Sequence, residues 1–203
     1  SVTGVQTCAL PILRERPALV SLADDFVVLD ERTADDLLQE AVETWVRTNP
    51  AAAEAYLTPA QIDDAYTRNT RWPGAVKSMA MSFIRRAKDA QMTVEMVDQL
   101  RQRYQRDDLP LAAMCTDIYE QYERGLQYRG AVDFQDLIRL ALRILQTDTD
   151  YLARLRERFP YILEDEAQDS SKLQEDILRM IAGEDGNWVR VGDPNQAIYE
   201  SFT

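Results

Sequence analysis

Apolar side chains recur every three or four residues along most of the chain, a spacing typical of helices with one buried face. Thr33, which with Asp36 resembles a capping box, and Thr58, which precedes Pro59, each mark a predicted helix start. The first of these helices is expected to bury Leu37, Leu38, Ala41, Val42, Trp45 and Val46. Further helices are predicted over residues 74–89, 94–106, 110–129, 133–145, 151–158 and 173–181.

The pattern changes near Val132, and two later segments read as short strands. Tyr161–Leu163 and Trp188–Val191 are apolar runs too short for a helix, and they flank the predicted helix over residues 173–181. Strands that alternate with helices usually form a parallel sheet. We therefore predict a fold that is mostly α by content, in which a helical region over residues 13–132 precedes part of an α/β sheet over residues 133–203.

Polar residues follow both predicted strands. Glu164, Asp165 and Glu166 come after the first, and Gly192 and Asp193 come after the second. Because parallel strands deliver their carboxyl ends to one edge of a sheet, these groups are expected to lie together. Magnesium prefers oxygen ligands and is often held by one or two carboxylates with nucleotide phosphates. An isolated acidic run is usually a solvated turn, but the second segment favours a nucleotide site.

These segments resemble a known family. Asp165–Asp169 and Gly192–Tyr199 are similar to motifs II and III of UvrD/Rep-type superfamily 1 DNA helicases, and Val132–Leu137 resembles the segment that precedes motif II. The resemblance implies a RecA-like P-loop NTPase core. Residues 133–203 would then be the later part of its subdomain 1A, and residues 13–132 would be a helical insert like subdomain 1B.

The resemblance also implies ATP and Mg²⁺ as cofactors and 3′-to-5′ movement on DNA, either single-stranded or at a junction with duplex. It implies that Asp165 binds magnesium, that Glu166 is the catalytic base and that Gln196 senses the γ-phosphate. It further places Gln168, Asp169 and Asp193 in the nucleotide site and Tyr199 on DNA.

The chain departs from the family pattern in several places. Glu164 stands where an apolar residue is usual, so a third charge is expected at the site or in solvent. Glu200–Phe202 replaces a common Arg-Trp-Arg run, and Phe202 is a candidate substitute for stacking on a base. The sequence lacks a G-x-x-x-x-G-K-[ST] phosphate loop. We therefore expect a helicase fragment that is inactive alone, with residues 1–12 an adapter-derived scar.

Charge and composition add a few expectations. The net charge is −12, which is unfavourable for DNA binding unless basic residues cluster locally. Arg86 and Lys88 are the main DNA-binding candidates. They belong to a basic group near Trp72 and Phe83 that also contains Arg68, Arg71, Lys77, Arg85, Arg101, Arg103 and Arg106. The absence of a long apolar run predicts no membrane partner, and the two cysteines suit a cytoplasmic protein.

Two other functions remain open at this stage. A metal-dependent nuclease would use Glu164, Asp165, Glu166 and Asp169, but the sequence contains no separate second acidic motif. A non-enzymatic helical nucleic-acid-binding module would retain the basic cluster and keep the carboxylates only as relics.

Overall fold

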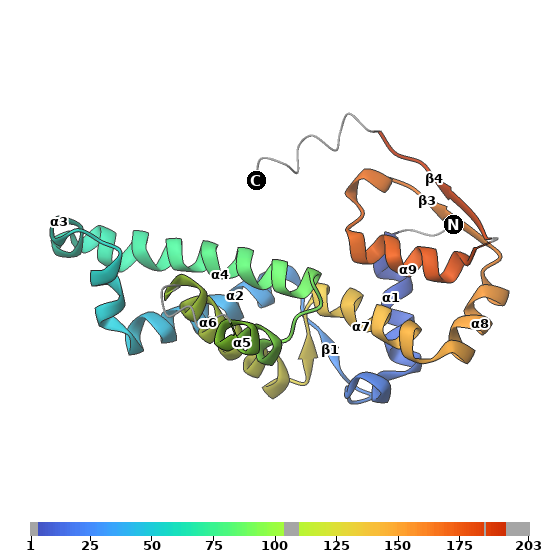
Figure 1. Cartoon of the computed structure of the whole chain (residues 1–203), viewed down its shortest axis with the longest axis horizontal. Coiled ribbons are helices and arrows are strands. Elements are labelled where there is room, and N and C mark those ends of the chain that lie inside the picture. The colour runs from blue at the N-terminus through green and yellow to red at the C-terminus, as the bar shows by residue number, and fades with distance from the viewer. Residues whose placement is uncertain (1–3, 104–109, 185, 194–203) are drawn as a thin grey trace. The chain divides into compact units, whose positions relative to one another are not determined.

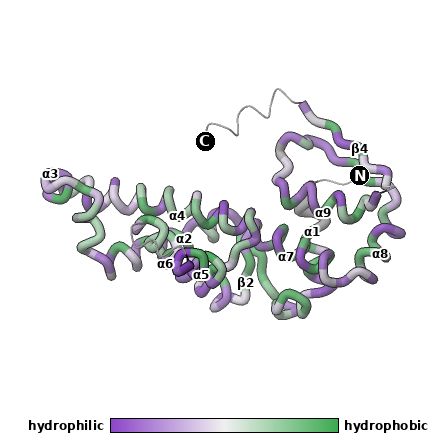
Figure 2. The backbone as a smooth tube through the Cα atoms, viewed as in Figure 1, coloured by the Kyte–Doolittle hydropathy of each residue, from purple (hydrophilic) through white to green (hydrophobic). Residues whose placement is uncertain are grey.

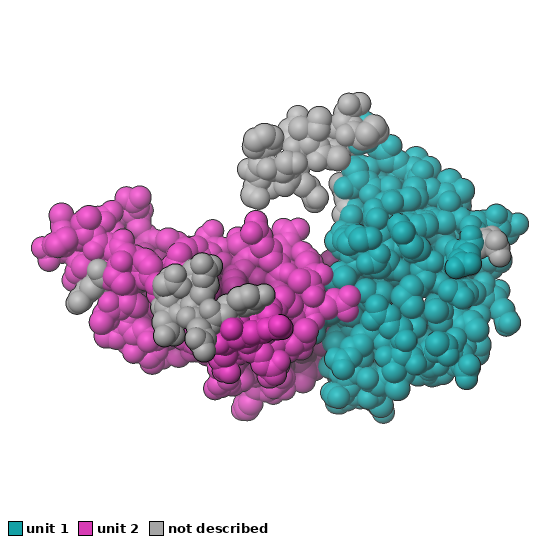
Figure 3. All heavy atoms as spheres, in the orientation of Figure 1, with its two compact units in different colours: residues 1–26, 135–203 teal, residues 27–134 magenta. Residues whose placement is uncertain are grey.

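A computed structural model describes residues 4–103, 110–184 and 186–193, and Figure 1 shows its elements in chain order. The described chain is mostly helical and divides into two compact units, coloured separately in Figure 3. Unit 1 contains residues 1–26 and 135–203, and unit 2 is Val27–Phe134. In the described part of the chain, no helix is long and apolar enough to cross a membrane.

Unit 2 is built on three long helices that pack around one core. They are α2 (Glu31–Thr48), α4 (Trp72–Asp89) and α6 (Pro110–Tyr128), with α5 (Val94–Arg103) against α6. The tube in Figure 2 alternates between hydrophobic and hydrophilic stretches along these helices. The predicted face of α2 is confirmed, because Leu37, Leu38, Ala41, Val42 and Trp45 are buried and Val46 packs against the core. The shorter elements are η2 (Pro50–Ala55), α3 (Pro59–Asp63) and the π-helical turn η3 (Thr67–Arg71).

The helix starts correct one prediction and confirm another. Helix α2 begins two residues before Thr33, and its N-cap is Asp30, whose carboxylate accepts a hydrogen bond from the Thr33 N–H at 2.7 Å. The predicted Thr33–Asp36 capping box is therefore wrong, because Asp30 already accepts from that backbone donor. Helix α3 begins at Pro59 as predicted, and the Thr58 N–H donates to the Gln61 side chain.

Two very short strands lie at the ends of unit 2. Strand β1 (Val27–Val28) pairs in parallel with β2 (Ala131–Val132), far along the sequence. The Val27 N–H donates to the Gly130 carbonyl at 3.0 Å, and the Leu29 N–H donates to the Val132 carbonyl at 2.9 Å. Neither strand was predicted, since two residues are too few to show a period.

Unit 1 combines the start and the end of the chain. It holds α1 (Gly4–Glu15), η1 (Pro17–Val20), most of α7 (Phe134–Thr147), α8 (Thr149–Arg158) and α9 (Lys172–Ala182). Ala9, Ile12 and Leu13 of α1 are buried. Residues that we excluded from the fold as a scar thus contribute helix and core, although their origin stays a prediction. Residues 13–26 also lie in unit 1, whereas we had grouped them with the helical insert.

The predicted strand–helix–strand region of unit 1 is present. Strand β3 (Tyr161–Glu164) pairs in parallel with β4 (Asn187–Arg190), and α9 connects them and packs against both. Ile162 and Glu164 are buried, whereas Tyr161 and Leu163 are exposed. Because side chains alternate along a strand, one face of this pair carries the buried residues and the other is open. The turn η4 (Ala167–Asp169) lies between β3 and α9.

Candidate active site

The candidate site begins at the turn that follows β3. Asp165 and Glu166 are both exposed, and the Asp165 Oδ1 atom accepts a hydrogen bond from the Glu166 N–H at 3.0 Å. Glu166 has φ 52° and ψ 45°, the left-handed conformation. This conformation costs a non-glycine residue of order 1–3 kcal/mol, and it persists only where the surroundings fix the backbone. The turn therefore presents two adjacent carboxylates on a constrained backbone.

The segment after β4 lies directly against this turn. The Val191 N–H donates to the Glu164 carbonyl at 2.8 Å, and the Ala167 N–H donates to the Val191 carbonyl at 3.0 Å. A Cβ atom on Gly192 would lie 2.5 Å from the Gln168 Oε1 atom and 3.1 Å from the Ala167 nitrogen. Only glycine allows so close an approach without movement of its neighbours. The two predicted motifs are thus in contact through their backbones.

Gln168 bridges the two motifs with its side-chain amide. Its Nε2 atom donates to the Glu166 Oε2 atom at 2.6 Å, and its Oε1 atom accepts from the Asp193 N–H at 3.1 Å. The sequence predicted a nucleotide-site role for Gln168, and the structure adds a link between Glu166 and the Gly192–Asp193 turn. This link orients the Glu166 carboxylate.

The donor set at the turn suits a magnesium ion bound jointly with phosphates. Asp165 offers an exposed carboxylate at the end of a strand, and Mg²⁺ is commonly held by one or two protein carboxylates together with waters and substrate phosphates. Among the described residues, no group of three or more potential ligands gathers as it would in an all-protein metal site.

Glu164 is the main surprise near the site. It is neither a third charge at the turn nor a solvated group, because it is only 7% exposed and pairs with Arg190. Hydrogen bonding to Glu175 is the main cause that raises the pKa of Arg190 above its usual value, and the charges of Glu164 and Glu175 add to it. We did not single out Arg190, although the parallel register places it directly opposite Glu164.

Several predicted site residues lie outside the part of the chain that the structure describes. These are Gln196, Tyr199 and Phe202. The side chain of Asp169 is likewise not described, although its backbone belongs to η4. Their assignments stay predictions.

The structure corrects the DNA-binding candidates in unit 2. Lys88 has no exposed surface, and its ammonium lies 2.6 Å from the Asp133 Oδ2 atom and 3.0 Å from the Glu123 Oε1 atom. It occupies the buried stripe of α4 and is therefore not available on the surface. Trp72 is also in the core, where its ring stacks on Tyr56.

Arg86 remains a surface candidate. It is exposed and lines an apolar groove of about 700 Å³ between α4, α5 and α6. The groove also contains Cys115, and burial raises the pKa of that thiol to about 11. Four other arginines of the predicted basic group are exposed as well, namely Arg68, Arg71, Arg85 and Arg103.

Comparison with known proteins decides the family. The family model for the UvrD/REP helicase N-terminal domain matches residues 2–202. The chain belongs to the UvrD/REP helicase family. The assignment of the two segments that meet around Gln168 to motifs II and III of UvrD/REP helicases is consistent with this membership and stays a prediction.

Individual relatives of this UvrD/REP chain are helicases of bacteria. An ATP-dependent helicase/nuclease of Exiguobacterium sibiricum is 35% identical over 140 residues, which are 66% of this chain and 11% of that protein. The "ATP-dependent DNA helicase PcrA" of Leuconostoc citreum is 37% identical over 83 residues, 41% of this chain and 11% of that protein. The "DNA helicase II" of Escherichia coli is 34% identical over 90 residues, 44% of this chain and 12% of that protein. The chain thus spans only a small part of the length of these relatives.

Proposed function

We propose that this chain supplies the magnesium-binding and water-activating carboxylates of an ATP-dependent DNA helicase that moves 3′ to 5′. The observation that carries the proposal is the contact between the two motifs, in which Gln168 joins Glu166 to the turn at Asp193. Family membership and the helicase names of the relatives support the class of enzyme.

The two carboxylates have separate roles in this proposal. Asp165 holds Mg²⁺, which would neutralise charge on the transferred phosphate. Glu166 orients the attacking water and accepts its proton, a contribution worth roughly 10²–10⁴-fold in rate for a well-placed general base. Because Gln168 donates to the Glu166 carboxylate, a shift of the Gly192–Asp193 turn would change the orientation of that base. Gln196 is proposed to sense the γ-phosphate.

DNA binding is assigned to exposed basic residues and to the aromatic residues beyond motif III. Arg86 and the neighbouring exposed arginines of unit 2 are proposed to contact backbone phosphates, so DNA affinity should fall steeply with salt. Tyr199 and Phe202 are proposed to stack on bases of single-stranded DNA.

The metal role can be tested on the 203-residue chain with Mn²⁺ as a paramagnetic substitute for Mg²⁺. We expect Mn²⁺ to broaden the amide NMR signals of Asp165 and Glu166, with and without added ATP. Asp165→Asn should remove this broadening, whereas Asp25→Asn, at another exposed aspartate of unit 1, should not. Equal broadening in the Asp165→Asn variant would contradict the metal assignment.

The catalytic role needs a helicase polypeptide that contains this chain together with a phosphate loop. There Glu166→Gln should lower ATP turnover by roughly 10²–10⁴-fold. The 203-residue chain should not hydrolyse ATP measurably, since it has no G-x-x-x-x-G-K-[ST] sequence. Metal-dependent cleavage of DNA by the chain, lost in Asp165→Asn, would instead favour a nuclease.

A further inference from the structure

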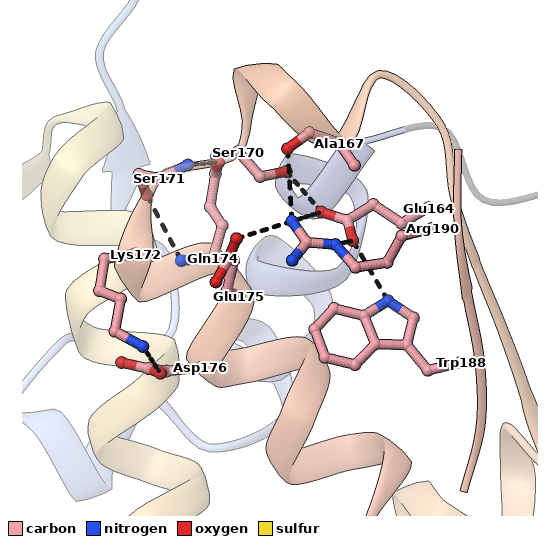
Figure 4. A network of polar contacts seen from close by, with 10 residues as sticks. All are labelled: Glu164, Ala167, Ser170, Ser171, Lys172, Gln174, Glu175, Asp176, Trp188 and Arg190. Atoms are coloured by element: carbon pink, nitrogen blue, oxygen red, sulfur yellow. Dashed lines mark hydrogen bonds and ion pairs between the residues drawn. The ribbon is translucent and has the colours of Figure 1, made fainter. Parts of the chain in front are cut away.

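A buried ionic network lies under α9, next to the candidate site but not part of the two motifs. Glu164 ends β3, and Arg190 lies directly opposite it in the parallel register of β4. In a parallel pair, residues in register project to the same face of the sheet. Figure 4 shows both side chains on the side where Glu175 of α9 approaches them.

Arg190 contacts three groups from different parts of unit 1. Its Nε atom lies 2.7 Å from the Glu164 Oε2 atom, and its Nη2 atom donates to the Glu175 Oε1 atom at 2.7 Å. The same Nη2 atom lies 3.3 Å from the Ala167 carbonyl oxygen. A guanidinium has five donors in a fixed fork, so one arginine can serve all three partners at once.

Glu164 is held by further donors. The Ser170 hydroxyl donates to its Oε1 atom at 2.6 Å, and the Trp188 indole N–H donates to its Oε2 atom at 3.2 Å. The side chain of Glu164 is 4% exposed, so this carboxylate is fully removed from water and fully paired. Such a network is stabilising only because each charge has its partners.

The network closes around the turn that carries the candidate catalytic residues. Ala167 follows Glu166 directly, and its peptide groups are held from two sides. Its N–H donates to the Val191 carbonyl at 3.0 Å, while its carbonyl oxygen faces the Arg190 guanidinium. Ser170, at the far end of the turn, is tied to Glu164 at the near end. The turn from Glu164 to Ser170 is thus fixed at both ends and at its middle.

We propose that Glu164 and Arg190 are positioning residues, which fix the backbone of the Asp165–Glu166 turn relative to the strand that bears Gly192 and Asp193. This inference rests on the proposed function of that turn. Neither side chain touches the groups assigned to metal binding or to water activation, so both act through Ala167 and Ser170. The left-handed backbone of Glu166 needs this kind of support, because a non-glycine residue does not keep it unaided.

A purely structural ion pair would behave differently from a positioning network. Well-packed apolar residues often replace a buried ion pair with no loss of stability. They would fill the space between the sheet and α9, but they would not hydrogen-bond to the Ala167 carbonyl or to Ser170. Stability and the order of the turn are therefore separable by mutation.

Amide hydrogen exchange of the 203-residue chain, followed by NMR without metal or nucleotide, tests the proposal. Arg190→Lys keeps the charge but loses the fork, and we expect the Ala167 amide to exchange at least about tenfold faster. The double variant Glu164→Val with Arg190→Val should unfold at a denaturant concentration close to that of the wild type. It should nevertheless show the same faster exchange at Ala167 and a higher Mn²⁺ concentration for half-broadening of Asp165.

The matched control is Lys172→Met, which removes an exposed ion pair with Asp176 on the same helix. This control should leave exchange at Ala167 and the Trp188 indole signal unchanged. Wild-type exchange at Ala167 in Arg190→Lys, or in the double variant, would overturn the positioning role. If the double variant does not fold, Arg190→Lys still decides the question.

The outcomes also separate this inference from the proposed function. Faster exchange in the variants, with no Mn²⁺ bound at Asp165 in the wild type, would reject the metal site and with it the reaction that the turn is said to serve. Mn²⁺ bound at Asp165, with exchange and Mn²⁺ affinity unchanged in the variants, would reject the positioning role alone.

Discussion

Replacing Lys88 by methionine should destabilise unit 2 strongly. Lys88 has no exposed surface, and its ammonium neutralises Asp133, which is 6% exposed, at 2.6 Å. Methionine keeps most of the side-chain volume but leaves the Asp133 carboxylate buried without that cation. Removing one partner of a buried ion pair typically costs about 3–5 kcal/mol. The Tyr122 hydroxyl, which donates to the same oxygen at 2.9 Å, is uncharged and offsets only part of this loss.

The measurement is the free energy of unfolding from denaturant titration, followed by circular dichroism and by fluorescence. Trp45 and Trp72 are buried in the core of unit 2 and report its unfolding. Lys77→Met is the matched control on the same helix. Lys77 pairs with Asp35 at 2.8 Å, but their side chains are 21% and 44% exposed, so the expected loss is only about 0–1 kcal/mol.

A second variant identifies the cause of the Lys88 effect. Asp133→Asn added to Lys88→Met removes the unpaired buried charge, so most of the lost stability should return. Two results would refute the reasoning. One is a loss in Lys88→Met no larger than in Lys77→Met, and the other is a double variant as unstable as the single one.

Two further predictions follow from a glycine and a cysteine. Gly192→Ala should destabilise unit 1 by about 1–3 kcal/mol because the added methyl meets Gln168 and the Ala167 backbone. Gly74→Ala on α4, where a Cβ meets nothing within 4 Å, should instead stabilise by about 0.5–1 kcal/mol, and equal signs in chemical denaturation would contradict this. Cys115, with its pKa raised by burial to about 11, should react with iodoacetamide at pH 8 roughly 100-fold more slowly than the unfolded chain in a Cys8→Ser background. Since burial favours the neutral thiol, its contribution to stability should be lost as pH rises from about 9 towards 11, and a flat pH profile of the alkylation rate would argue against it.

Local periodicity predicted the strand–helix–strand region and the buried face of α2 well, because each depends on neighbours in sequence. It failed where a distant partner decides the outcome. Lys88 follows Ile84 by one helical turn on the buried stripe of α4, but only Asp133, 45 residues later, makes its burial favourable. Glu164 was misplaced for the same reason, since its partner Arg190 lies 26 residues away on another strand.

The site was predicted in the same uneven way. Motif spacing placed Asp165, Glu166 and Gly192 at one sheet edge, and the backbone contacts between the turns agree with that placement. The bridge through Gln168 was not foreseen, because a side-chain amide oriented by two backbones has no sequence period. The Asp30 cap was missed because the apolar stripe, which begins at Leu37, does not show where the first helical turn starts.

The pairing of β1 with β2 has a consequence for how this protein can vary. The chain leaves unit 1 after Phe26 and re-enters it after Phe134, and the two crossing segments are hydrogen-bonded side by side. Adjacent ends mean that unit 1 requires only a short closure there, whatever lies between them, and the entropic cost of closure grows slowly with length. Unit 2 can therefore be lengthened, shortened or exchanged in evolution or by engineering with little effect on the fold that holds the carboxylates.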